Sequence, residues 1–240
     1  MATTETPWAG ESDDKLYLQS GQFSATIRTS LSVGAINLRP QGVEWDGTNS
    51  VWCAKQVYQK LYLQSGKFSA TMKTSLSLGA DPTGCSEDGT DTLWNSDVVD
   101  KLYLQSGKFS ATIKTSLSII GTAGNVQDCS FDGTDTLWSD SSTDKLYLQS
   151  GKFSATLKTS LDVSSIDTEP NGLSWDGTNT PVSGIVSDKL YLFSGKFSIT
   201  LKTSLDVSAV DGSAIGISTD DVTGRLVGAG AAFTPTAVIF

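Results

Sequence analysis

The sequence predicts an all-β fold, a five-bladed β-propeller with four antiparallel strands in each blade, and three observations support this prediction. A segment that reads Lys-Leu-Tyr-Leu-Gln-Ser-Gly-Lys-Phe-Ser-Ala-Thr-Leu-Lys-Thr-Ser-Leu in its fourth copy occurs five times, at steps of 45, 41, 44 and 44 residues. The units are rich in Thr, Val, Leu, Ile and aromatic residues, which favour strands. Four short strands repeated about every 40–50 residues are typical of a propeller. The copies start at Lys15, Lys60, Lys101, Lys145 and Lys189.

The first two strands of each unit, A and B, are separated by an Asp-Gly pair. In one unit strand A runs from Gly172 through Trp175 to Asp176-Gly177, and strand B follows. Asp-Gly between two short apolar runs is a strong hairpin signal, because glycine tolerates the positive φ of a tight turn. In four units strand B carries a tryptophan, and Val182 takes that position in the remaining one.

Strand C is the Leu-Tyr-Leu run, and strand D is the Phe-to-Leu run that follows it. In the fourth copy Phe153, Ala155, Leu157 and Leu161 alternate with polar residues, which is the period of a half-buried strand. Strand D also carries one basic residue per copy, and a charge on an outermost strand prevents edge-to-edge pairing. We therefore expect strand D to form the exposed outer edge. The basic residues are Arg28, Lys73, Lys114, Lys158 and Lys202.

The two ends of the chain each hold part of one unit. Trp8 lies in a strand B that has no strand A before it, and Ala214 to Asp220 reads as a strand A with no strand B after it. We expect the two parts to join in one blade, so that ladder hydrogen bonds close the ring. The predicted domain organisation is a single propeller over residues 1–224 and an apolar tail over 225–240.

The pattern Gly172-Leu173-Ser174-Trp175-Asp176-Gly177-Thr178-Asn179, then a Trp position, then Asp188-Lys189-Leu190-Tyr191, resembles the blades of NHL-like propellers. The resemblance extends to every unit, with a few residues in each. It implies a blade fold and no activity, and no functional residue is carried over from it.

Composition and charge disfavour several classes of function. The chain has no histidine, which removes the commonest general acid–base residue and the commonest zinc ligand. A net charge of −9 disfavours binding to nucleic acid and to anionic membranes. No run of about 18 apolar residues predicts a membrane span. Met1 to Ser12 lacks a secretory signal, so we expect an extracellular or particle-surface location reached without one, with the cytoplasm as the alternative.

Enzyme motifs are absent, so we expect no catalytic residues and a protein that is not an enzyme. There is no Walker loop, G-x-S-x-G elbow or cysteine–histidine pair. Glycoside hydrolysis by paired carboxylates is a weaker alternative, because the best single acids, Glu44 and Glu87, are out of step within strand A. Cys85 and Cys129 share one repeat position and are expected to be small core residues, with a bridged pair as the alternative.

Two sets of residues recur once per blade and are candidate ligand sites. One is a ring of turn aspartates that could hold Ca²⁺, although Asp before Gly is also ordinary turn chemistry. The other is a set of tryptophans that could stack on sugar rings, although burial between blades is the alternative. The aspartates are Asp46, Asp88, Asp132, Asp176 and Asp220; the tryptophans are Trp8, Trp52, Trp94 and Trp138.

The loops divide into a uniform set and a variable set. The A–B and C–D loops are nearly identical among the copies, whereas the D–A and B–C loops differ in sequence and length. In an antiparallel blade these two sets lie on opposite faces. We expect specific contacts on the variable face, since loops on a rigid scaffold usually carry recognition. The uniform face could instead bind a repeated ligand through five weak sites.

These features favour a structural or adhesive propeller on a particle or filament, with a phage as one source of such a protein. The alternative is a multivalent lectin-like module that binds carbohydrate. The apolar tail could donate a strand to a neighbouring subunit or to a structural partner, or it could pack on its own blade. The tail residues expected to mediate assembly are Leu226, Val227, Phe233, Val238, Ile239 and Phe240.

Overall fold

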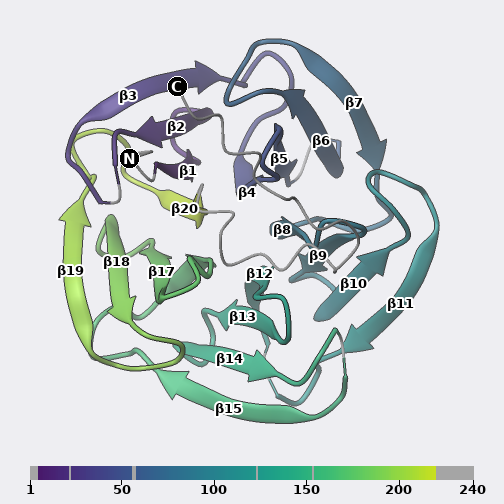
Figure 1. Ribbon diagram of the computed structural model, residues 1–240, viewed down its shortest axis with the longest axis vertical. Helices are drawn as coiled ribbons and strands as arrows, with labels where there is room; N and C mark the ends of the chain where they lie inside the picture. Colours follow the sequence, from purple (N-terminus) through teal and green to yellow (C-terminus); the bar gives the residue numbers. More distant parts are fainter. Residues whose placement is uncertain (1–4, 22, 56–57, 123, 153, 220–240) are drawn as a thin grey trace, which may run out of the picture.

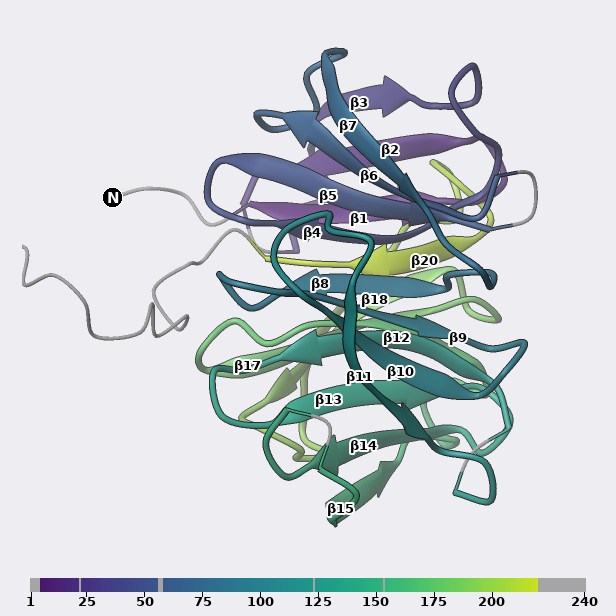
Figure 2. The same ribbon diagram turned by 90° about the vertical axis from the view of Figure 1, so that its right-hand side faces the viewer.

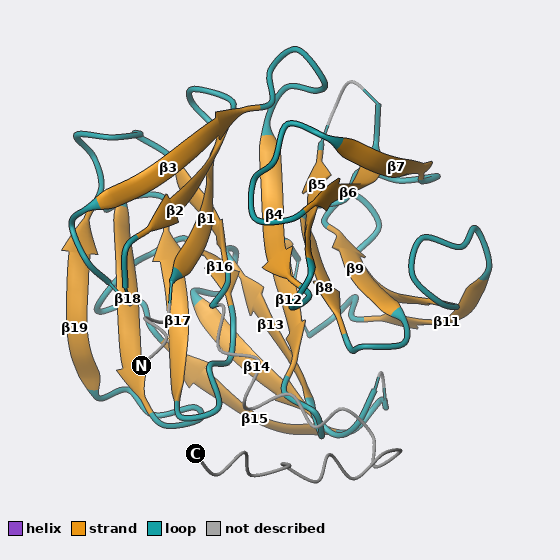
Figure 3. Ribbon diagram, turned by 45° about the horizontal axis from the view of Figure 1, so that its top comes forward, coloured by secondary structure: helices purple, strands orange, loops and turns teal. Residues whose placement is uncertain are grey.

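The computed structural model describes residues 5–21, 23–55, 58–122, 124–152 and 154–219. Within these ranges the chain forms 20 strands and no helix, as Figure 3 shows. None of the described residues therefore forms a helix that could cross a membrane. The strands form five four-stranded antiparallel sheets, which we number blades I to V.

In the order A, B, C, D, blade I consists of β20 (Ala214–Ile217), β1 (Thr6–Gly10), β2 (Lys15–Gln19) and β3 (Ile27–Ser32). Blade II consists of β4 (Pro40–Trp45), β5 (Asn49–Ala54), β6 (Lys60–Ser65) and β7 (Met72–Ser77). Blade III consists of β8 (Gly84–Glu87), β9 (Thr92–Ser96), β10 (Lys101–Gln105) and β11 (Ile113–Ser118). Blade IV consists of β12 (Val126–Phe131), β13 (Thr136–Asp140), β14 (Lys145–Gln149) and β15 (Leu157–Asp162). Blade V consists of β16 (Pro170–Leu173), β17 (Asn179–Gly184), β18 (Lys189–Ser194) and β19 (Leu201–Asp206).

The five sheets surround a central axis, and the predicted five-bladed β-propeller is confirmed. Figure 1 shows the A strands near the centre and the D strands on the rim. Figure 2 shows that the inner strands run roughly along the axis, from one face of the disc to the other. The B–C and D–A loops therefore lie on one face, and the A–B and C–D loops lie on the other.

The ring closes as the sequence predicts. Strand β20 pairs antiparallel with β1, with Trp8 opposite Ile217 and Gly10 opposite Ala214. Strand β1 pairs on its other side with β2. One sheet thus holds both ends of the described chain, and opening the ring would break ladder hydrogen bonds.

Strand D begins later than the sequence indicates. In blade II it starts at Met72, four residues after Phe68, and Phe68 has a φ of 52°. The Ser69 hydroxyl accepts the Thr71 N–H at 3.2 Å, and the Ser65 N–H donates to the Thr71 carbonyl at 2.9 Å. These bonds hold the Phe-Ser-Ala-Thr segment as a turn instead of a strand. Phe153, its counterpart in blade IV, lies outside the described residues.

The hydrophobic core lies between neighbouring blades. Between blades IV and V, for example, Leu146 and Leu148 pack in one cluster with Val182 and Tyr191. The four strand-B tryptophans are 0–3% exposed, and each stacks on the strand-C tyrosine opposite it with ring centroids 4.0–4.3 Å apart. Burial of such large rings contributes strongly to the packing of blade on blade.

The cysteines are core residues, as the first interpretation of the sequence predicts. Cys53, Cys85 and Cys129 are buried and carry free thiols. Burial raises the pKa of the Cys85 and Cys129 thiols well above its usual value, so both are held in the neutral form.

The A strands meet so closely at the axis that four of them have glycine at one position. A Cβ on Gly172 would lie 2.6 Å from the Ile217 nitrogen and 2.7 Å from the Gly216 Cα. In the fifth A strand this position is Asp128, whose carboxylate accepts the N–H groups of Cys129 at 2.8 Å and Leu173 at 3.0 Å. Burial raises the pKa of Asp128 well above its usual value. The other three glycines are Gly42, Gly84 and Gly216.

Candidate functional site at the axial end of the variable face

The turn aspartates of the uniform face bind their own backbone. The Asp132 carboxylate accepts the N–H groups of Thr134 and Asp135, both at 2.8 Å. The following glycine has a φ of 91° at Gly133, which explains why glycine is needed there. Asp46, Asp88 and Asp176 make the same pair of bonds in their blades.

Three of these aspartates are also paired with a lysine from the next blade. Lys108 of blade III lies 2.8 Å from the Asp46 carboxylate of blade II. Burial by itself would raise the pKa of Asp46, but Lys108 and the two backbone N–H groups together hold it below its usual value. Lys152 pairs with Asp88 and Lys196 pairs with Asp132 in the same way.

This arrangement does not form the calcium ring that the sequence suggested. Over the described ranges, no three Asp, Glu or Cys side chains come together as a group that could hold a metal ion. The carboxylates instead sit at separate turns, where backbone N–H groups and lysines hold them. Asp220, the fifth candidate, lies outside the described residues.

The basic residues of strand D also have partners within their own blades. Lys158 on β15 reaches across the sheet to Asp135, at the start of strand B, at 2.7 Å. Strand D does form the outer edge, but these side chains link it to strand B as well as placing charge on the edge. The equivalent pairs are Arg28 with Glu5, Lys73 with Asn49, Lys114 with Asp91, and Lys202 with Asn179.

The tryptophans proposed as sugar-stacking residues lie inside the molecule. Trp8, Trp52 and Trp138 are at most 1% exposed, and Trp94 is 3% exposed. Each stacks on a tyrosine between blades, and only Trp94 among them also lines a cavity in the described part of the chain. Burial between blades was the alternative that the sequence allowed.

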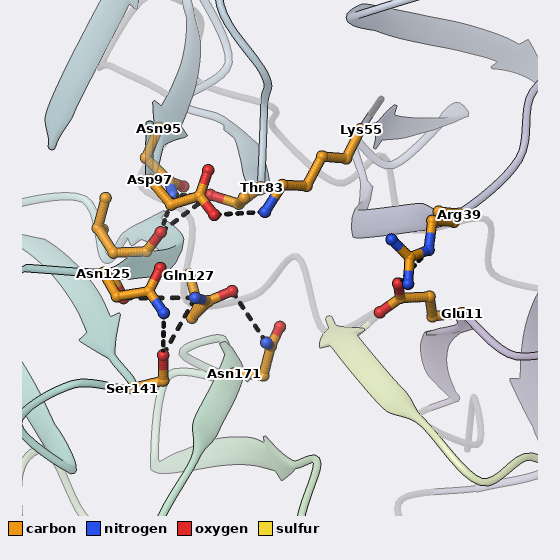
Figure 4. A network of polar contacts seen from close by, with 11 residues as sticks. Glu11, Arg39, Lys55, Thr83, Asn95, Asp97, Asn125, Gln127, Ser141 and Asn171 are labelled. Atoms are coloured by element: carbon orange, nitrogen blue, oxygen red, sulfur yellow. Dashed lines mark hydrogen bonds and ion pairs between the residues drawn. The ribbon is translucent and has the colours of Figure 1, made fainter. Parts of the chain in front are cut away.

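On the variable face, charged side chains from blades I to III lie around the central axis, and we call this axial end of the variable face the mouth (Figure 4). Glu11, in the B–C turn of blade I, lies 2.5 Å from Arg39, which precedes β4. Lys55, which follows β5, pairs with Asp97, which follows β9. Both ion pairs link neighbouring blades, and Arg39 is 45% exposed. The second carboxylate oxygen of Asp97 is buried without a hydrogen-bond partner.

Uncharged side chains from blades III to V complete the mouth (Figure 4). The Asn171 amide donates to Gln127 at 3.1 Å, and the Gln127 amide donates to the Ser141 hydroxyl at 3.1 Å. The Asn95 amide donates to Thr83 at 2.6 Å. The side-chain oxygens of Asn95 and Asn171 are buried without a partner. The mouth therefore combines two ion pairs with buried acceptors that a donor group on a ligand could satisfy.

A pair of acids lies on the same face where the ring closes. Asp211 is 4% exposed and hydrogen-bonds to Asp13; its pKa is raised to about 6, first by burial and then by Asp13. Burial opposes the ionisation of Asp13, but hydrogen bonds from Asp211, Lys15 and Tyr17 hold its pKa below the usual value. The pair can therefore hold one proton near neutral pH. The two acids are 198 residues apart in the chain, and the sequence pattern did not predict their contact.

Comparisons with known proteins identify the fold. No protein-family model matches the chain, and no curated protein matches it either. Among solved structures, a chain of a nidogen/laminin complex aligns with a TM-score of 0.60 at 12% identity, covering 90% of this chain and 98% of that chain. The glutaminyl cyclase of Myxococcus xanthus aligns with a TM-score of 0.51 at 14% identity, covering 75% of this chain and 69% of that chain. A streptogramin B lyase aligns with a TM-score of 0.50 at 15% identity, covering 82% of this chain and 69% of that chain.

These comparisons correct the expectation that the protein is not an enzyme. The cyclase and the lyase are enzymes by name, and both share the fold with this chain. The fold is therefore compatible with catalysis, and missing motifs do not exclude it. At identities of 12–15% the likeness shows the fold alone.

Proposed function

We propose that the protein is a recognition propeller, a structural or adhesive component that binds a macromolecular partner at the mouth, the axial end of its variable face. The observation that carries this proposal is the difference between the two faces. On the uniform face, carboxylates are held by their own turns and by lysines in a repeated pattern. At the mouth, Asp97 and Asn171 each keep a buried oxygen without a partner.

The chemistry of the mouth indicates what the partner presents. Buried acceptor oxygens require donors, and a protein loop offers them as backbone N–H, amide or ammonium groups. The ion pairs of Arg39 and Lys55 lie beside these acceptors and can exchange their partners for groups on a bound chain. Such a mouth suits one asymmetric partner and not five identical ligands.

The mouth is tested with a particle or filament fraction from the source culture. We compare biotin-labelled wild-type protein with the double variant Arg39→Ala/Asp97→Ala and with the uniform-face control Lys108→Ala/Lys152→Ala. The expected result is binding to the fraction that is lost in the mouth variant and kept in the control. Equal binding by all three proteins, or equal loss in both variants, overturns the proposal.

Self-association through the tail is a separate part of the proposal. Residues Leu226, Val227, Phe233, Val238, Ile239 and Phe240 lie outside the described residues, and their apolar character supports a role in assembly. Analytical ultracentrifugation compares the full chain with a chain that ends at residue 224. The full chain is expected to assemble as concentration rises while the shortened chain stays monomeric. A full chain that remains monomeric at high concentration contradicts this part.

The lectin alternative has lost its main support, because the tryptophans that would stack on sugars are buried. If the protein binds no sugar on a glycan array, the lectin alternative is wrong. Hydrolysis is a second candidate, favoured by the contact between Asp13 and Asp211, in which burial and Asp13 raise the pKa of Asp211 to about 6. Wild-type protein and the Asp211→Asn variant are compared on nitrophenyl glycosides and esters. Turnover that disappears in the variant supports hydrolysis. If the wild-type protein turns over these substrates no faster than buffer alone, hydrolysis is excluded for them.

A further inference from the structure

A cavity of about 310 Å³ lies between blades II and III, and none of the residues named at the mouth lines it. Small-molecule sites in proteins begin at about this size. Blade II contributes the end of β7 and the loop that follows it, and blade III contributes the remaining walls. None of the lining residues carries a charge. They are Ser77, Leu78, Gly79, Ala80, Trp94, Val99, Tyr103, Gln105, Ala111 and Ile113.

The cavity lies where one D–A loop is shorter than the other four. Six residues, 78–83, connect β7 to the axial Gly84. Nine residues make the same connection elsewhere, at 33–41, 119–127, 163–171 and 207–215. The three missing residues account for the 41-residue step in the repeat. Blade III therefore lacks the loop segment that covers the strand-C tyrosine in the other blades.

In the other four blades the tyrosine hydroxyl has a polar partner. Tyr147 lies 3.0 Å from the Thr143 hydroxyl and donates to the Thr122 carbonyl at 3.2 Å. The Tyr191 hydroxyl lies 2.8 Å from the Ser187 hydroxyl and 3.2 Å from the Ile166 carbonyl oxygen. Tyr17 donates to Asp13, and Tyr62 accepts from the Asn37 amide at 3.1 Å. Each partner comes from the B–C turn or from the D–A loop.

Blade III has lost both kinds of partner. Val99 stands four residues before Tyr103, where blades I, IV and V have Asp13, Thr143 and Ser187. The shortened loop supplies no carbonyl or amide. The Tyr103 hydroxyl has no hydrogen-bond partner within the described part of the chain, and its side chain is partly exposed while the other four tyrosines are buried. Burial raises the pKa of Tyr103, so the hydroxyl keeps its proton.

A second polar group on the cavity wall also lacks a partner. Gln105 is 2% exposed and its side-chain oxygen is buried without a hydrogen bond. The indole N–H of Trp94, 3% exposed, is likewise without a partner. In blade IV the equivalent groups bond to each other, with the Trp138 N–H donating to Gln149 at 3.2 Å. The same groups are unbonded in blades I and II as well, so blade III is distinguished by the cavity they line and by Tyr103. Unsatisfied buried groups beside a cavity indicate a site for a ligand with matching groups.

We propose that this cavity binds a small, neutral molecule that has a flat ring and a hydrogen-bond acceptor. The ring packs between Leu78 and Ile113, beside the stacked Trp94–Tyr103 pair, because aromatic groups favour aromatic neighbours. The acceptor receives a hydrogen bond from the Tyr103 hydroxyl. A charged ligand is excluded because no lining side chain would neutralise it. This site goes beyond the proposed recognition function and does not depend on it.

The first test uses benzamide, a neutral ring with a carbonyl acceptor, as the probe. Backbone amide shifts of residues 78–80 and 111–113 are followed by NMR during titration. Saturable shifts are expected for the wild type and for Ala155→Phe, the matched change at the equivalent exposed position in blade IV. Ala111→Phe fills the cavity and is expected to weaken binding at least tenfold. Absence of saturable shifts in the wild type, or unchanged binding in Ala111→Phe, overturns the proposal.

The second test examines whether the ligand needs a hydrogen-bond acceptor and whether it must be neutral. Benzamide is expected to bind about tenfold more tightly than toluene, which has the same ring without an acceptor, and benzoate is not expected to bind. Tyr103→Phe should reduce benzamide binding to the level of toluene, whereas the matched Tyr147→Phe should leave it unchanged. Val99→Ser should also weaken benzamide binding, because it restores a hydroxyl like that of Ser187 beside Tyr103. If benzamide and toluene bind equally, or if benzoate binds best, the assigned ligand class is wrong.

Discussion

Trp8 in the first strand stands directly opposite Ile217 in the last described strand, and both side chains are buried. They share one core cluster with Tyr17, Leu190 and Val207, which come from blades I and V. The contact therefore closes a sheet and seals the interface between two blades at the same place. An open ring would expose this cluster to water, so closure is stabilised by both ladder hydrogen bonds and apolar burial.

We expect Ile217→Ala to lower the free energy of unfolding by about 2–4 kcal/mol, because it removes buried methyl groups from this cluster. Urea denaturation followed by tryptophan fluorescence measures the change. Ile120→Ala is the control, since Ile120 is 70% exposed, and it should change stability by no more than about 0.5 kcal/mol. Equal effects of the two substitutions would mean that closure contributes little to stability.

The closing pair could be predicted because the repeat identifies each strand by its neighbours. Trp8 occupies the strand-B position and Ile217 the strand-A position, so the shared sheet followed from counting units. The start of strand D could not be located in this way. Phe68 continues an alternating pattern in sequence, yet its positive φ and the Ser69–Thr71 bond make that segment a turn.

The acid pair on the variable face was not predictable from the pattern. Asp13 and Asp211 come from different loops, and their contact depends on how blade I closes. The cavity of blade III, by contrast, left a signal in the sequence. The 41-residue step and the replacement of a polar residue by Val99 are both visible when the copies are aligned. Their meaning became clear only from the hydrogen bonds of the other tyrosines.

The axial glycine position should tolerate no side chain in four of the blades. Gly172→Ala is expected to destabilise the protein by about 2–3 kcal/mol, because the new Cβ would lie 2.6 Å from the Ile217 nitrogen, which belongs to rigid backbone. Gly212→Ala is the control, since a Cβ added there would meet nothing within 4 Å and the φ of Gly212 is not positive. Thermal unfolding of the two variants gives the comparison. A tolerated Gly172→Ala would show that the inner strands can move apart.

In the inter-blade ion pairs, the aspartate should contribute more than the lysine to the free energy of unfolding. Asp46→Ala removes two bonds to backbone N–H groups, at 2.8 and 2.6 Å, as well as the Lys108 contact, and should cost about 1–2 kcal/mol. Lys108→Ala removes only a partly exposed ion pair and should cost less than about 1 kcal/mol. Urea denaturation at low and high salt measures both. The lysine effect should shrink as salt rises, and the aspartate effect should largely persist. A larger loss from Lys108→Ala would contradict the assignment of these aspartates to turn formation.

Stability should fall as pH rises from about 4 to 6, because the pKa of Asp211 is raised to about 6 in the folded protein. In that range the folded state keeps a proton that the unfolded state has already lost, so raising the pH favours unfolding. The opposite shift of Asp13 acts at lower pH, where its stabilising contribution is lost as the carboxylate is protonated. We expect Asp211 to account for about 1 kcal/mol across this range once solvent screening of the partly exposed Asp13 is considered.

Urea denaturation at several pH values should show a flatter profile of stability against pH for Asp211→Asn than for the wild type. Asp167→Asn is the positional control, because Asp167 bonds to the Ser187 hydroxyl and not to a second carboxyl group. If the wild type and Asp211→Asn show the same slope between pH 4 and 6, the two acids do not share a proton.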